Sequence, residues 1–134
     1  MRADVVIYNL LKNDVDVSAL TSKIFPRIAP QTVDPNLVIT YSIITTNSIQ
    51  TQTMEINTDM VTVQVSCFAR SYDDTQSLAD AVVAALHAKS GTVSVSGNDY
   101  YYKNIRIVGR NDLGFDDENE VYMIAIDFSI MMIV

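Results

Sequence analysis

The segment from residue 121 to residue 134 constrains the fold more than any other part of this chain. It reads VYMIAIDFSIMMIV, and apolar side chains dominate both of its alternating sets of positions. A strand that is apolar on both faces is typical of a strand that is covered on both sides. In a small protein, that cover must come from its own helices, from a neighbouring subunit, or from both. The segment therefore indicates a component of an assembly.

Length and composition predict a folded protein. The chain has 134 residues, so we expect one domain spanning residues 1–134. A hydrophobic content of 49% and a charged content of 19% exclude a disordered chain. The single cysteine, Cys67, allows no internal disulfide and fits synthesis in the cytoplasm. We expect no membrane association, because the apolar segment is too short for a helical span and Asp127 interrupts it. A signal peptide is not expected either.

The formal net charge of −7 argues against tight nucleic-acid binding. Neutralising phosphates requires a basic surface. An acidic protein can still lie beside DNA that must slide past without sticking. Charge alone does not separate that role from ordinary solubility.

Two segments have the spacing of amphipathic helices. Residues 2–13 carry a periodic set of apolar side chains around Tyr8. Residues 72–88 follow Ser71, a candidate N-cap, and hold acidic side chains in the first turn, with Gly91 close to a C-cap position. We expect strands, from β-branched and alternating residues, over 37–46, 59–70, 92–96, 100–109 and 121–134.

This order of elements predicts an α+β fold. We expect a mainly antiparallel sheet of about four to five strands, with the two helices packed on one face. Residues 46–58, TNSIQTQTMEINT, contain neither Gly nor Pro. They predict a long β-hairpin arm that continues both flanking strands, although a floppy loop is an equal alternative. Such an arm could pair with a neighbouring subunit by strand addition.

Residues 21–36 contain all three prolines and predict an extended connector. Its apolar side chains either cover an edge of the core, which we favour, or contact a partner. Residues 110–120 predict a solvated acidic loop, and we expect Asp127 to pair with Arg106 or Arg110.

No arrangement of residues in the sequence points to catalysis. The chain lacks a Gly-rich phosphate loop, a Ser/His/Asp arrangement and a Cys/His cluster. A single histidine, His87, and a single cysteine exclude most zinc sites, and the acidic residues lack EF-hand spacing. We expect Cys67 to be a small buried hydrophobe. The chain is therefore expected to have no catalytic, cofactor or metal site, and not to be an enzyme.

Three segments, in order, resemble the tail-completion proteins of long-tailed bacteriophages. YNLLKNDVDVSALTSKIFPRIAPQ, residues 8–31, resembles their opening helix with a Leu pair and an IFPRIAPQ-like stretch. VQVSCFARSYDDTQSLADAVVAAL, residues 63–86, resembles their strand–helix unit. LGFDDENEVYMIAIDFSI, residues 113–130, resembles their closing acidic turn and strand.

The resemblance implies a structural virion protein of the tail or neck, assembled in the host cytoplasm. Such tail terminators form a hexameric ring that caps the tail tube, ends its polymerisation and joins the tail to the head connector proteins. Genome DNA passes through the lumen without specific binding. The alternatives are a connector stopper or another neck ring, and a tail-tube subunit. The residues that we expect first at subunit or partner interfaces are Ile24, Phe25, Arg27, Gln50, Thr51, Gln52, Thr53, Met54 and Asp116.

Overall fold

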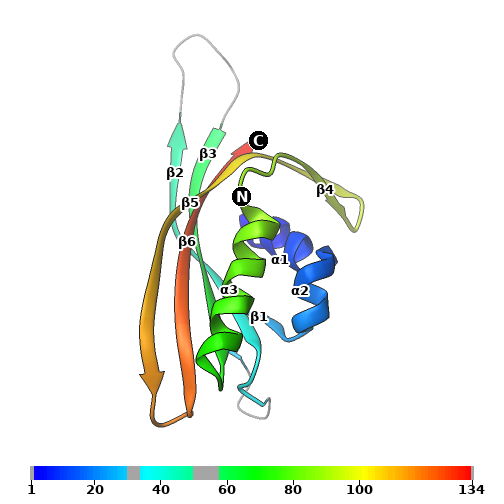
Figure 1. Cartoon of the computed structure of the whole chain (residues 1–134). Coiled ribbons are helices and arrows are strands. Elements are labelled where there is room, and N and C mark those ends of the chain that lie inside the picture. The colour runs from blue at the N-terminus through cyan, green and yellow to red at the C-terminus, as the bar shows by residue number, and fades with distance from the viewer. Residues whose placement is uncertain (1, 30–33, 50–57, 134) are drawn as a thin grey trace.

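The computed structural model describes residues 2–29, 34–49 and 58–133 (Figure 1). The described elements are the helices α1 (Ala3–Asn13), α2 (Val15–Leu20) and α3 (Tyr72–Leu86), and the strands β1 (Ile24–Pro26), β2 (Val38–Ile49), β3 (Thr58–Ala69), β4 (Gly91–Val95), β5 (Asn98–Asp116) and β6 (Val121–Ile133).

The strands form one curled sheet in the order β1-β2-β3-β6-β5-β4. The expected fold, a mainly antiparallel sheet of about four to five strands, is therefore right only in outline. The described sheet has six strands and is mixed, because β1 runs parallel to β2. The β1 strand covers only Ile24–Pro26, which is too short for a periodic signal, and proline is tolerated at a sheet edge.

All three described helices lie on the same face of the sheet (Figure 1). The expectation of two helices was wrong, because residues 15–20, between the first expected helix and the connector, form the helix α2. Asp14 is the N-cap of this helix: its Oδ1 accepts a hydrogen bond from the backbone N–H of Val17 at 3.0 Å. An Asp in this position starts a helix by satisfying an end donor, so the same residue can be mistaken for a loop residue.

The α3 helix follows its prediction closely. The Oγ atom of Ser71 accepts a hydrogen bond from the backbone N–H of Asp74 at 3.4 Å, as expected of the N-cap. The C-terminal end differs from the expectation. Ala88 takes the left-handed conformation with φ 63°, whereas Gly91 begins β4.

The β5 strand extends to Asp116, well beyond the expected end at residue 109. Most of the expected acidic loop is therefore strand, and the turn to β6 occupies only residues 117–120. Register shifts between Ile107 and Gly109 and between Asp112 and Gly114 show why the sequence misleads. In the sequence, each glycine suggests the end of a strand. In the structure, each lies at a β-bulge, and β5 stays paired with β6 on both sides of the bulge.

The core lies between the helices and the central strands β3 and β6. Val63 pairs with Phe128, and Val65 pairs with Ile126, so alternate side chains of both strands point to the helices. The β6 strand has helices on one face only. Its other face carries Met123, Asp127, Ser129 and Met131, which are half-buried, and no described helix covers that side.

Candidate assembly surfaces

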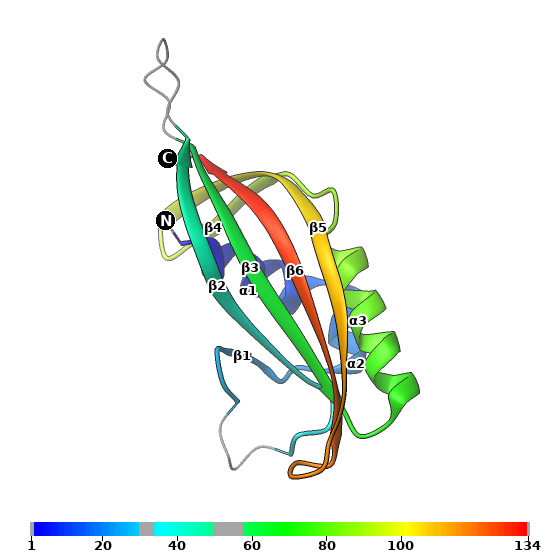
Figure 2. The same cartoon turned by 90° about the vertical axis from the view of Figure 1, so that its left-hand side faces the viewer.

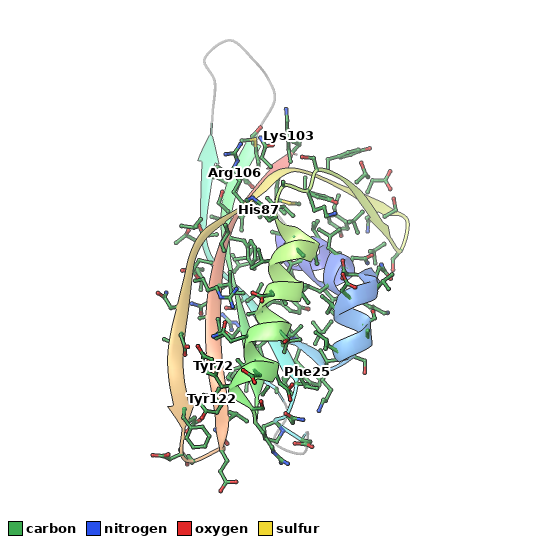
Figure 3. The ribbon with its side chains drawn as sticks, viewed as in Figure 1. Phe25, Tyr72, His87, Lys103, Arg106 and Tyr122 are labelled. Atoms are coloured by element: carbon green, nitrogen blue, oxygen red, sulfur yellow. The ribbon has the colours of Figure 1, made fainter. Side chains whose placement is uncertain are left out.

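The connector residues that we expected at an interface do not form one accessible surface. Ile24 is 8% exposed and belongs to the core, as the edge-covering interpretation of the connector requires. Phe25 is half-buried and Arg27 is exposed (Figure 3 labels Phe25). The backbone N–H of Arg27 donates to the carbonyl oxygen of Tyr41 at 2.8 Å, which extends the contact between the connector and β2 by one residue.

A shallow groove of about 310 Å³ lies beside this contact. Arg2 and Asp4 from the start of α1 line it together with Arg27 and Tyr41. Arg2 donates two hydrogen bonds to the Asp4 carboxylate, at 3.0 and 3.1 Å. Burial alone would raise the pKa of Asp4, but the hydrogen bond and charge of Arg2 outweigh it and lower the pKa. The groove is open and mixed in charge, and it holds no catalytic arrangement.

The candidate residues Gln50, Thr51, Gln52, Thr53 and Met54 lie outside the described residues. The structure describes the strands on either side of them. The β2 strand continues to Ile49 and β3 begins at Thr58, with Ile49 paired to Thr58. The predicted extension of both flanking strands is present up to these residues.

Asp116 organises the acidic turn that joins β5 to β6. Its Oδ2 accepts a hydrogen bond from the side-chain amide of Asn119 at 2.8 Å, and its Oδ1 accepts one from the backbone N–H of Glu118 at 3.0 Å. These two bonds hold the pKa of Asp116 below its ordinary value. Within the described residues, no three His, Cys, Asp or Glu side chains are grouped to hold a metal ion. Asp116 thus shapes an acidic surface turn.

Figure 2 shows the helix-free face of the sheet, with the helices behind it. The side chains along the centre of this face are mostly polar. The side chains of Thr62, Gln64 and Ser66 from β3 share this face with Asp127 and Ser129 from β6. The expected pairing of Asp127 with Arg106 or Arg110 is wrong. Arg110 points to the helix side and binds Asp80, and the ion pairs of the described residues include none between Asp127 and Arg106. Among the described residues, no group donates a hydrogen bond to the buried Oδ1 of Asp127.

The two edges of the sheet are a surface that our sequence analysis missed. Four of the exposed large hydrophobic side chains lie along them: Ile44 on β2, and Val108, Leu113 and Phe115 on β5. Ile44, Val108 and Leu113 lie at β-bulges. The sequence did contain a signal for two of these bulges. Gly109 follows Val108 and Gly114 follows Leu113, and an isolated Gly within a strand pattern suggests a bulge.

The remaining candidate reactive groups have structural surroundings. Cys67 is fully buried in the core, as expected, and burial raises the pKa of its thiol to about 12. His87 caps the C-terminal end of α3, and its Nδ1 accepts a hydrogen bond from the backbone N–H of Ile107 at 3.4 Å. His87 therefore joins α3 to β5 (Figure 3).

The sequence profile of the family described as "Tail completion protein gp17" matches residues 5–133 of this chain. This chain belongs to that family. It is a structural protein of the bacteriophage virion tail and not an enzyme. The three resembling segments noted in the sequence thus identified the family correctly.

Structural comparison gives a consistent fold. A chain in the virion of a native gene transfer agent (GTA) particle matches with a TM-score of 0.72 and 12% sequence identity. The match covers 96% of this chain and 92% of that chain. At this identity the likeness concerns the fold. No curated protein matches the sequence. Among the described residues, no helix combines the length and the apolar composition needed to cross a membrane.

Proposed function

We propose that this chain is a tail terminator, folded as one domain, that forms a closed ring of about six subunits on the end of the tail tube. The ring ends polymerisation of the tube protein and joins the tail to the head connector proteins. The observation that carries this proposal is the match of the tail-completion family over residues 5–133. The fold shared with a chain of a phage-like particle supports it.

The surfaces of the molecule are compatible with this role. A ring subunit needs two different contact surfaces that meet in the next copy. The exposed apolar side chains on the two sheet edges suit such contacts. We retain Phe25, Arg27, Asp116 and the segment from Gln50 to Met54 as candidate contacts with the tube or the connector.

The charge balance supports passage of DNA through the ring. The chain carries a formal net charge of −7, and the central side chains of the helix-free face are mostly uncharged and polar. The same face also carries Lys103 and Arg106, which lie opposite Met131 and Ser129. Phosphates bind surfaces rich in Lys and Arg, so a ring of subunits with a net negative charge would let the genome move without specific binding.

Two related roles are the alternatives. A connector stopper would also form a closed ring, whereas a tail-tube subunit would stack into long tubes. The molar mass of the purified protein can be measured by light scattering, with negative-stain images of the same sample. This measurement distinguishes a terminator from a tail-tube subunit, but not from a connector stopper. Closed rings of about six subunits support the proposal. Long tubes formed by this protein alone would assign it to the tube instead.

A further inference from the structure

The two sheet edges are each unpaired over a long stretch. Strand β1 covers the outer edge of β2 only up to Tyr41. Over residues 42–49, the described residues give this outer edge no partner, while the inner edge of β2 stays paired with β3. Strand β4 covers β5 only up to Tyr102, and Ala88 and Lys89 bond to the backbone of Ile105. Beyond that point, the described residues give the outer edge of β5 no partner strand over residues 108–116.

The directions of these two edges are complementary. The four central strands β2, β3, β6 and β5 are antiparallel to their neighbours, so β2 and β5 run in opposite directions. Rotation about a ring axis preserves the direction of each strand along that axis. The β5 strand of one copy would therefore meet the β2 strand of the next copy in antiparallel orientation. Antiparallel pairing of this kind gives strong, straight backbone hydrogen bonds.

Exposed apolar side chains mark both unpaired stretches. On β5, Val108 is 65% exposed and Leu113 is 56% exposed. On β2, Ile44 is 53% exposed. Soluble proteins usually protect free edges with Lys, Pro or bulges. These edges have bulges, but the residues at the bulges expose apolar side chains to solvent. Exposed apolar side chains of this kind favour contact with a partner surface over contact with water.

The two stretches are offset along the strands by the amount that a closed sheet requires. Asp112, at the middle of the β5 stretch, is level with Ile39 of β2 through the pairs with Ile124 and Cys67. The middle of the β2 stretch lies about six residues further on, or about 20 Å at the usual rise of a strand. Four strand spacings add about 19 Å across the sheet. The resulting tilt of about 45° is close to the tilt of 35–45° in closed β-barrels.

The sense of the offset selects which face points inward. Seen from the helix-free face with β2 pointing up, β2 lies on the left and β5 on the right (Figure 2). Joining the upper part of β2 to the lower part of the preceding copy's β5 slants the strands from lower right to upper left. Strands in closed sheets coil in a right-handed sense because of their right-handed twist. A right-handed coil has this slant when it is viewed from inside the ring.

We propose that the ring closes by edge-to-edge pairing of β5 in one copy with β2 in the next, so that one continuous antiparallel sheet encircles the lumen. The helix-free face lines the lumen and the three described helices lie outside. Centring the two stretches on each other places Leu113 opposite Ile44 of the neighbouring copy. This inference rests on the ring that we proposed above and adds its interface and its orientation.

Disulfide trapping tests this interface directly. Side chains directly opposite on paired strands have Cβ atoms about 5 Å apart, so Ile44→Cys and Leu113→Cys in one chain should form disulfides between copies. In a glutathione redox buffer, we expect a ladder of covalent oligomers that ends at the closed ring and disappears on reduction. The native Cys67 can stay, because it is fully buried.

The matched control pairs Ile44→Cys with Val15→Cys. Val15 lies on α2 and is 81% exposed, so it is at least as accessible as Leu113 but far from the proposed contact. We expect at least tenfold less ladder from this control at every protein concentration. Equal yields of disulfide-linked oligomers from the two variants, in rings or in dilute monomer, would overturn the proposed pairing of β5 with β2.

A charge substitution provides the second test. Leu113→Glu places a charge on an exposed side chain, so the monomer should unfold at the same denaturant concentration as the parent chain while its ring mass falls to that of the monomer. Val15→Glu should leave the rings unchanged. Rings of normal mass with Leu113→Glu, and no disulfide ladder, would refute the edge pairing while the terminator proposal stands. If the parent chain forms no rings and the disulfide variant gives no ladder above its control, both proposals fail.

Labelling tests which face of the sheet points into the lumen of the ring. A gold cluster on maleimide, coupled to Gln64→Cys on the helix-free face, should appear inside the ring in negative-stain images. The same label on Ala84→Cys, an exposed position of α3, should appear outside. The reverse pattern would contradict the lumen assignment.

Discussion

Arg110 of β5 is bound to Asp80 of α3: its Nη1 donates a hydrogen bond to Oδ1 of Asp80 at 2.7 Å. Its Nη2 donates a second hydrogen bond to Oε1 of Gln76, one turn earlier in the helix, at 2.6 Å. Arg110 therefore holds against α3 the part of β5 whose outer edge has no partner strand among the described residues. The same contact removes Arg110 from Asp127, the partner that the sequence suggested.

We predict that this contact adds little to monomer stability. The side chain of Arg110 is 29% exposed and that of Asp80 is 70% exposed, and surface ion pairs contribute about 0–1 kcal/mol. Arg110→Met should lower the free energy of unfolding in urea by no more than about 1 kcal/mol. Arg70→Met, which breaks the exposed pair with Asp34, is the matched control. A loss several times larger than in the control would mean that Arg110 has a further structural role.

The core between α3 and β6 should respond much more strongly. Phe128 is fully buried, and truncating a buried Phe to Ala typically costs about 3–5 kcal/mol. Phe128→Ala should reduce the free energy of unfolding by this amount. Phe115→Ala is the control, because Phe115 is 47% exposed and packs against Tyr122 in a T-shaped ring pair. Its loss should be about 1 kcal/mol or less, and similar losses in both variants would contradict the assigned core.

The N-cap of α3 can be tested by one substitution series. Ser71→Ala removes the acceptor for the backbone N–H of Asp74 and should cost about 1 kcal/mol. Ser71→Asp keeps an acceptor and should restore most of the stability. Thermal unfolding followed by circular dichroism measures both. Equal midpoints for the Ala and Asp variants would show that the cap does not contribute.

The acidic turn gives a prediction about pH. The Asn119 amide and the Glu118 N–H bind the charged carboxylate of Asp116 and lower its pKa. Because the folded pKa lies below the unfolded one, this stabilisation is present above the ordinary carboxyl pKa. It is lost as the pH falls through the lowered value. Asn119→Ala should raise the pKa of Asp116 toward its ordinary value.

Carboxyl chemical shifts in an NMR titration measure this change for each aspartate. Asp4 serves as the internal control, because its pKa is lowered by Arg2 and does not depend on Asn119. An unchanged pKa of Asp116 in the Asn119→Ala variant would contradict the assigned cause.

The sequence predicted those elements whose signals are local. Ser71 followed by acidic residues and an apolar stripe predicted α3, and alternation in β3 predicted which side chains enter the core. The apolar segment after residue 121 predicted the central strand β6. Each of these signals depends on residues within one element, so no knowledge of distant partners was needed.

The missed features depend on pairing between distant segments. Strand β1 exists because residues 24–26 lie beside Ile39–Tyr41 of β2, which a short proline-containing segment does not reveal. The extension of β5 depends on bulges that keep register with β6 around Gly109 and Gly114. The free edges follow from both, so the candidate interface at Leu113 and Ile44 became visible only with the strand order.

The most direct test of the terminator function is the length of the tails made without this protein. A phage with an amber codon at the Tyr8 codon, grown without a suppressor, should produce overlong tails that are not joined to heads in electron micrographs of the lysate. Tails of normal length, detached from heads, would contradict the terminator assignment and favour a connector stopper, and the absence of tubes would favour a tail-tube subunit.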